Sequence, residues 1–150
     1  MQSEIEKIKH LRDQTGISFN EIKKALEEAG GDMTKAVETL RARGVLTAQK
    51  KSARETKEGV IESYIHLTKK IGSLVELYCE TDFVARNIEF IKLAHELAMQ
   101  VASMDPKDNE ELLEQLYIKD QDVTVNDLIQ QYIAKLGENV KLGRFIRFEI

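Results

Sequence analysis

Apolar residues recur at helical spacing in three short runs within residues 3–44, and a capping signal precedes each run. The candidate caps are Ser3 with Glu6, Ser18 with Glu21, and Asp32. The apolar positions are Ile5, Ile8 and Leu11, then Ile22, Ala25, Leu26 and Ala29, then Met33, Ala36, Val37 and Leu40. Glycines typical of helix ends follow the runs: Gly16, Gly30-Gly31 and Gly44. Helices this short bury their stripes only against each other, so the pattern predicts a three-helix bundle.

The pattern then changes to simple alternation, which predicts β-strands. The expected strands are Val60–Leu67 and Ile71–Cys79, and Thr68-Lys69-Lys70 fits the hairpin connection between them, with Gly72 allowing a bulge. The apolar residues that share a face are Ile61, Ile65 and Leu67 in the first strand, and Ile71, Val75, Leu77 and Cys79 in the second. The β-rich run from Val140 to Ile150 is expected to join this hairpin as a third strand.

Helical spacing also appears between the hairpin and this last run. A long helix is predicted by Phe90, Ile91, Ala94, Leu97, Ala98 and Val101, and a short helix by Leu112, Leu113 and Leu116. A further helix begins after the Thr124 and Asp127 cap, continues through Leu128 and Leu136, and ends at Gly137. The predicted fold class is therefore α+β: an N-terminal three-helix bundle, then a small antiparallel three-stranded sheet with helices on one face.

Composition excludes several classes of protein. The chain has 150 residues, of which 42% are hydrophobic and 32% charged, which is too apolar for a disordered chain. No stretch approaches the roughly 18 apolar residues of a membrane span, and charges in Met1–Leu11 argue against a secretory leader. The single cysteine, Cys79, excludes an internal disulfide framework. We therefore expect a cytoplasmic protein that does not contact membranes.

Charge divides the chain unevenly. Residues 1–54 carry a net charge of +3 and residues 55–150 a net charge of −7, and the excess comes from Lys50, Lys51 and Arg54. We divide the chain into a bundle (1–45), a basic linker (46–58) and an α+β core (59–150). The linker fits a solvated connector, an extended helical tail, or a contact strip for an acidic partner. One short basic patch on an acidic chain does not predict direct nucleic-acid binding.

Candidate catalytic groups are few. The three histidines, His10, His66 and His95, have no neighbours at metal-ligand spacing, so no metal site is predicted. Cys79 could act as a nucleophile if His66 approached it, but the carboxylates of Glu80 and Asp82 would raise the pKa of its thiol. Those two carboxylates are also a candidate acid–base pair. Because glycine-rich phosphate loops are absent, we expect a binding protein without a cofactor rather than an enzyme.

The segment from Glu80 to Asn87 is unusual in this chain. A strand ends, the Thr81-Asp82 pair can cap a helical turn, and the aromatic ring of Phe83 follows at once. Taken alone, the segment allows a purely structural interpretation in which Asp82 is a helix cap and Phe83 packs into the core.

The string Glu80-Thr81-Asp82-Phe83-Val84-Ala85-Arg86-Asn87 resembles the signature of elongation factor Ts, the guanine-nucleotide exchange factor of elongation factor Tu. The resemblance extends over essentially the whole chain. Its other points are Leu11-Arg12, Thr15-Gly16, Lys23-Lys24-Ala25-Leu26, Gly31-Asp32, Leu40-Arg41, Gly44, Lys50-Lys51, Gly59-Val60 and Gly137-Glu138-Asn139. It implies that the bundle is similar to a ubiquitin-associated domain.

The resemblance also implies a mechanism and its residues. Phe83 would wedge into the GTPase and displace the groups that hold Mg²⁺, Asp82 would be its polar partner, and Thr81 and Val84 would shape the turn. Arg86 and Asn87 would complete this contact. In the bundle, the residues expected to contact elongation factor Tu are Arg12, Phe19, Asn20 and Lys23. Residues 17–22 depart from the family's usual small-residue and methionine-containing stretch.

The resemblance bears on assembly as well. Longer family members carry a second half-core, which this chain lacks, so we expect a homodimer through the sheet. Two other interpretations stay open at this stage. One is a ubiquitin-associated-like adaptor that binds through Ile17, Phe19 and Leu40, and the other is a thiol enzyme that uses Cys79 and His66.

Overall fold

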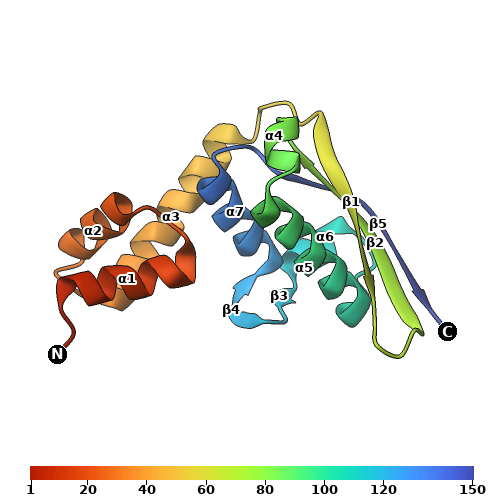
Figure 1. Ribbon diagram of the computed structural model, residues 1–150, viewed down its shortest axis with the longest axis horizontal. Coiled ribbons are helices and arrows are strands. Elements are labelled where there is room, and N and C mark those ends of the chain that lie inside the picture. The colour runs from red at the N-terminus through yellow and green to blue at the C-terminus, as the bar shows by residue number, and fades with distance from the viewer.

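The computed structural model describes residues 1–150 and begins with a bundle of three helices, α1 (Glu4–Thr15), α2 (Phe19–Glu28) and α3 (Met33–Lys51) (Figure 1). Their N-termini are capped by Ser3, Ser18 and Asp32, whose side chains accept hydrogen bonds from the backbone three residues later. The bundle has its own small core, which consists of Ile8, Leu11, Ile22, Ala25, Leu26, Ala36 and Leu40. The predicted three-helix bundle is confirmed.

The prediction that the third helix ends at Gly44 is wrong. Helix α3 continues for 19 residues to Lys51, so the first part of the expected linker is helical. A glycine inside a helix costs only about 1 kcal/mol relative to alanine, which tertiary contacts can outweigh. Those contacts come from helix α7 (Val125–Leu136), which lies along the second half of α3, and from Ala48, which is buried in the main core (Figure 1).

The main sheet contains β1 (Glu58–Ile65), β2 (Ile71–Cys79) and β5 (Lys141–Glu149), in the order β1-β2-β5 with both pairs antiparallel. The hairpin and the third strand are therefore confirmed. The expected bulge is not at Gly72: the register between β2 and β5 shifts between Val75 and Leu77 instead. Gly143 of β5 lies at this shift, and a side chain there would overlap Glu76 and Tyr78.

Helices cover one face of this sheet (Figure 1). They are α4 (Asp82–Ala85), α5 (Ile88–Met104) and α6 (Asn109–Glu114), while α7 packs on α5 and α6. A short hairpin of β3 (Leu116–Tyr117) and β4 (Asp120–Thr124) precedes α7. The main core lies between the sheet and these helices, and α5 supplies Phe90, Leu93, Ala94, Leu97, Ala98 and Val101 to it. The long helix and the Thr124 cap are confirmed.

Leu116 lies in β3 rather than in the short helix predicted for it. The reason is a pair of buried polar groups on α5. The side chain of Gln100 donates to the carbonyl of Leu116 (3.0 Å) and accepts from the amide of Ile118 (3.0 Å). One turn earlier, Glu96 accepts from the Tyr117 hydroxyl (2.8 Å) and contacts Lys119 (2.6 Å). Because burial and the adjacent carboxylate disfavour the phenolate, the pKa of Tyr117 is raised.

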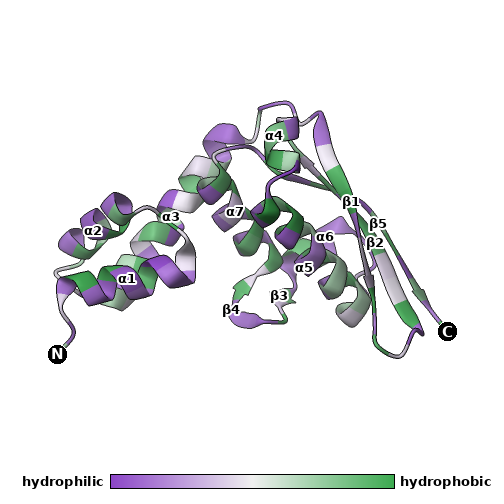
Figure 2. Ribbon diagram, viewed as in Figure 1, coloured by the Kyte–Doolittle hydropathy of each residue, from purple (hydrophilic) through white to green (hydrophobic).

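The other face of the sheet has no helices over it, and apolar side chains project from it. We call it the outer face, and its exposed apolar residues are Ile61, Ile65, Leu74, Ile146 and Phe148. Strongly hydrophobic residues along β1 and β2 are visible in Figure 2. Ile61 and Ile65 do share a face, as predicted, but that face points away from the helices while Val60 and Tyr64 pack against the core. Leu67 lies in the turn after β1 rather than in the strand.

One ion pair lies on the outer face. The guanidinium and the backbone amide of Arg144 donate to the carboxylate of Glu76 at 2.8–2.9 Å. These hydrogen bonds favour the ionised carboxylate and lower the pKa of Glu76 from its ordinary 4.5 to about 2. Because the pKa is lower in the folded than in the unfolded chain, the ionised carboxylate stabilises the fold at pH values above the unfolded-state pKa. That contribution is lost as the pH falls toward 2.

We therefore expect the Glu76 carboxyl to titrate near pH 2 in the folded protein, as measured by NMR of its side-chain carbon. Changing Arg144 to glutamine should move this midpoint back toward 4.5, because the guanidinium bonds are lost. A midpoint for Glu76 near its ordinary value of 4.5 in the unaltered protein would contradict the ion pair.

Candidate functional site

The segment after β2 forms one short helical turn, α4, one side of which is buried in the main core. The hydroxyl of Thr81 caps the turn by accepting from the amide of Val84 (3.3 Å). Val84 and Ala85 are buried in the main core. Phe83, at the second position of the turn, is 82% exposed. The structural interpretation of Phe83 as a core residue is therefore wrong, because the turn points its ring into solvent.

Two oppositely charged side chains flank this ring. The carboxylate of Asp82 and the guanidinium of Arg86 lie one helical turn apart, with 2.6 Å between their nearest atoms. Both are exposed, so the pair contributes little to stability and both groups remain accessible to a partner. Asp82 is not the helix cap, since Thr81 occupies that position.

Asn87 belongs to the structure of the next helix. Its side-chain oxygen accepts from the amide of Glu89 (2.8 Å) and caps α5. Ile88, which follows it, is 80% exposed and was not among the predicted site residues. The signal for Ile88 was present in the sequence, because it falls outside the apolar stripe that begins at Phe90. The site thus presents two large apolar side chains, those of Phe83 and Ile88, within six residues.

Beneath the turn lies the carboxylate of Glu138, from the loop between α7 and β5. It accepts from the amides of Glu80 (3.1 Å) and Thr81 (3.0 Å) and from the Thr81 hydroxyl (2.7 Å). The carboxylate of Glu80 in turn accepts from the amide of Asn139 (2.7 Å). Sequence reasoning noted Glu138 and Asn139 only as part of a family pattern, because their contacts join segments 57 to 59 residues apart.

The proposed thiol pair does not form. Cys79 lies opposite Glu58 at one end of the hairpin, and His66 follows the other end, eight residues along β1, or about 26 Å at roughly 3.3 Å per residue. Burial and the nearby Glu138 raise the pKa of Cys79 to about 11, so its thiol stays neutral at physiological pH. The carboxylates of Glu80 and Asp82 also bind different partners. No group of three metal-binding side chains comes together in the structure.

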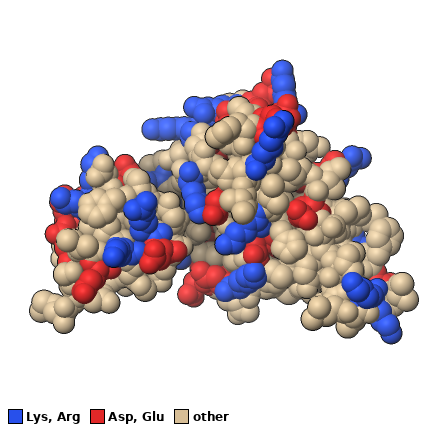
Figure 3. Space-filling view, viewed as in Figure 1, with Lys and Arg blue, Asp and Glu red and all other residues tan.

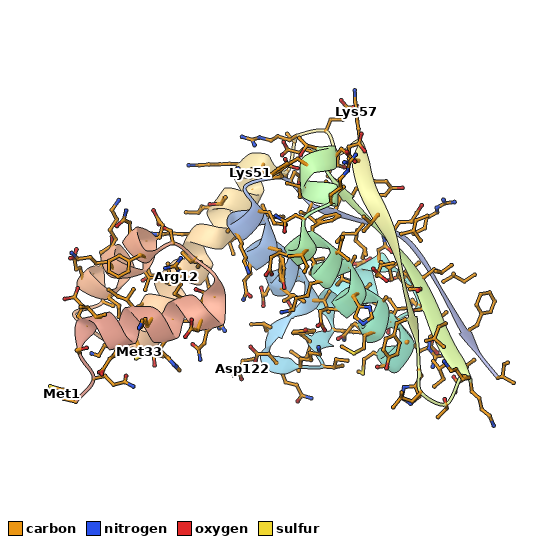
Figure 4. The ribbon with its side chains drawn as sticks, in the orientation of Figure 1. Met1, Arg12, Met33, Lys51, Lys57 and Asp122 are labelled. Atoms are coloured by element: carbon orange, nitrogen blue, oxygen red, sulfur yellow. The ribbon has the colours of Figure 1, made fainter.

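The bundle residues predicted to contact a partner lie on two parts of its surface. Phe19, Asn20 and Lys23 are exposed on α2, and Phe19 is 44% exposed. Arg12, at the end of α1, instead lines a hollow of about 480 Å³ between the bundle and α7, beside Lys135 (Figure 4). Leu40, assigned to a docking surface in the adaptor interpretation, is only 6% exposed and lies in the core of the bundle.

Known proteins match this chain over its full length. The family model described as Elongation factor TS matches residues 80–150. Elongation factor Ts of Thermotoga petrophila is 44% identical to this chain over 193 positions, which cover 100% of this chain and 97% of that protein. Elongation factor Ts of Thermosipho melanesiensis is 43% identical, over 95% of this chain and 96% of that protein. The chain belongs to the elongation factor Ts family.

The elongation factor Ts match bears directly on the candidate site. The matched segment begins at Glu80, so it contains the α4 turn as well as Glu138 and Asn139. The protein is accordingly a translation elongation factor. The comparison with the Thermotoga petrophila protein spans 193 positions, so at least 43 of them have no counterpart in these 150 residues. No helix in the structure combines the length and the hydropathy that a membrane span requires.

Proposed function

We propose that this elongation factor Ts family member is a guanine-nucleotide exchange factor that binds GDP-bound elongation factor Tu and promotes release of GDP. It performs no chemistry of its own and needs no cofactor. The observation that carries the proposal is Phe83, a large apolar ring that is 82% exposed on a turn whose other side is buried. A rigid aromatic loses little conformational entropy on binding, so it is well suited to enter a pocket of a partner.

The proposed mechanism is displacement. Mg²⁺ in a GTPase bridges phosphate oxygens and protein oxygens, and loss of that bridge weakens the bound nucleotide. Phe83 inserts into elongation factor Tu and moves the groups that hold the ion, while Asp82 and Arg86 flank the insertion. Thr81 and Val84 shape the turn that presents the ring. By linkage, a factor that favours the nucleotide-free GTPase lowers nucleotide affinity, and nucleotide expels the factor equally.

We assign the three parts of the chain separate roles. Residues 1–45 dock on elongation factor Tu through Phe19, Asn20, Lys23 and Arg12, residues 46–58 connect the parts, and residues 59–150 carry exchange and dimerisation. The exposure of the α2 residues supports docking. Positive and negative side chains gather near α4 in Figure 3, and Lys51 and Lys57 lie at that end of the molecule in Figure 4. This charged surface suits a polar rim around an inserted ring.

We also propose that the protein acts as a homodimer in the cytoplasm, with the outer faces of two sheets packed together. Contiguous exposed apolar residues of this kind mark interaction surfaces. A second copy is the occupant we favour, because a flat apolar face can pair with itself around a two-fold axis. Glu76 and Arg144, which lie among these apolar residues with Glu76 directly opposite Ile61, form an ion pair with each other.

The direct test is release of labelled GDP from elongation factor Tu with and without this protein. We expect release to accelerate, and the affinity of elongation factor Tu for GDP to fall by roughly 5- to 150-fold in the presence of the factor, the range of typical coupling between two ligands. Excess unlabelled GDP, added without the protein, gives the spontaneous rate. Excess GDP should also dissociate a complex of the two proteins, as reciprocity requires. GDP release that is unchanged at saturating protein would refute the proposal.

A further inference from the structure

Three segments that are distant in sequence meet beneath the α4 turn. They are the end of α3 with residues 51–54, the end of β2 at residues 80–81, and the loop at residues 137–139. Hydrogen bonds connect all three segments, and an ion pair joins Arg54 to Glu80 (3.6 Å). Such a junction fixes orientation, because hydrogen bonds depend on direction as well as distance.

The junction satisfies backbone groups that the sheet leaves without partners. Pairing of β2 with β5 ends at Tyr78, and pairing of β2 with β1 ends at Cys79. The next two amides, of Glu80 and Thr81, therefore lie beyond the ladder and need another acceptor. Glu138 is that acceptor for both, and its second oxygen accepts from the Thr81 hydroxyl. Charge-assisted hydrogen bonds of this kind are stronger than neutral ones.

The other side of the junction is itself held in place. The side-chain amide of Asn139, which is 2% exposed, donates to the carbonyls of Arg54 (2.8 Å) and Ser52 (3.4 Å). Lys51 donates to the carbonyl of Gly137 (2.8 Å). Glu138 thus projects from a loop that is tied on both sides, and it is half-buried. A support that is rigid in this way can set the direction of the turn it holds.

We propose that Glu138 is a positioning residue for exchange, which acts through Thr81 to hold the α4 turn in the orientation that aims Phe83 at the GTPase. The proposal rests on the exchange function proposed above. Without Glu138 the turn keeps its buried anchors, Val84 and Ala85, but its first residues gain freedom. Ordering them again during insertion then costs free energy in the exchange step rather than in the initial docking.

The experiment compares Glu138→Ala and Glu138→Gln with the unaltered protein in GDP release from elongation factor Tu. We expect Glu138→Ala to lower the maximal rate by about tenfold, while the half-saturating concentration changes by less than about threefold. Glu138→Gln retains a carbonyl oxygen that can accept from both amides, so it should restore part of the rate. Glu114→Ala, which removes an exposed carboxylate on α6, is the matched control and should have no effect.

A double-mutant cycle separates positioning from general stability. All rates are normalised to the folded fraction of each variant. If Glu138 acts through Phe83, the double variant should release GDP from elongation factor Tu almost as fast as Phe83→Ala alone. Additive losses would overturn the proposal, as would an unchanged maximal rate in Glu138→Ala.

A second measurement does not use elongation factor Tu. Hydrogen exchange at the amides of Glu80 and Thr81 should be at least about tenfold faster in Glu138→Ala than in the unaltered protein. Unchanged protection at both amides would overturn the positioning role by itself. If the unaltered protein failed to accelerate GDP release from elongation factor Tu, the exchange function would be refuted. The hydrogen-exchange measurement would still decide whether Glu138 orders the turn.

Discussion

Changing Phe83 to alanine should slow GDP release from elongation factor Tu by about 30-fold or more relative to the unaltered protein. A ring that fills a pocket at the centre of an interface is typically worth at least about 2 kcal/mol, and alanine removes that contact while keeping the backbone. The effect should appear mainly in the maximal rate, because docking by the bundle does not involve this side chain. Stopped-flow release of a fluorescent GDP analogue, measured over a range of factor concentrations, gives both parameters.

The same substitution should leave the fold intact. Phe83 is 82% exposed, so its loss should change the free energy of unfolding by no more than about 0.5 kcal/mol. Leu116→Ala is a matched control, because Leu116 is also exposed and apolar but lies in β3. That variant should promote GDP release from elongation factor Tu at the same rate as the unaltered protein. A Phe83→Ala protein that is folded and fully active would exclude the ring as the inserted group.

Local patterns predicted much of the site because short-range contacts build it. The cap at Thr81 joins residues three apart, and the Asp82–Arg86 pair joins residues four apart. The same applies to the caps of the bundle helices and to the Thr124 cap of α7. A reader of the sequence can therefore place the turn and its aromatic residue without knowing the rest of the fold.

Features that depend on distant segments could not be predicted in this way. Helix α3 passes Gly44 because α7 packs along it, although Gly44 reads locally as a helix stop. Leu116 is drawn into a strand by the side chain of Gln100, which lies on another helix. Glu138 accepts a hydrogen bond from the amide of Thr81, which is 57 residues away in the sequence, and no spacing rule connects the two segments. At Gly44 and Leu116, tertiary contacts outweigh a weak local preference.

Which face of the sheet packs against the helices could not be predicted, for a different reason. Strand β1 has apolar residues on both of its faces, so alternation indicates a strand but does not reveal which face meets the helices. The structure assigns Val60 and Tyr64 to the core and leaves Ile61 and Ile65 exposed. A sheet that is apolar on both faces is typical of one that is covered on both, which is the basis of the proposed homodimer.

Changing Ile146 to lysine should therefore convert a homodimer into a monomer. Ile146 lies on the outer face in the edge strand β5, directly opposite Leu74 of the central strand β2, which in turn lies opposite Ser63 of β1. A two-fold axis would place two copies of the new charge in one interface, and each would lose its hydration without a partner. The dimer should weaken by about a thousandfold, which sedimentation equilibrium at micromolar concentration would detect.

The control for this change is Leu46→Lys, which places the same charge on an exposed apolar position of α3, away from the sheet. It should sediment as the unaltered protein does. If the unaltered chain were a monomer at micromolar concentration, the homodimer would be refuted, and the outer face would need another partner. If Ile146→Lys remained a dimer, the two copies would associate through a different surface. Because Ile146 is 47% exposed and outside the core, a monomeric variant that unfolds like the parent would locate the interface on the outer face.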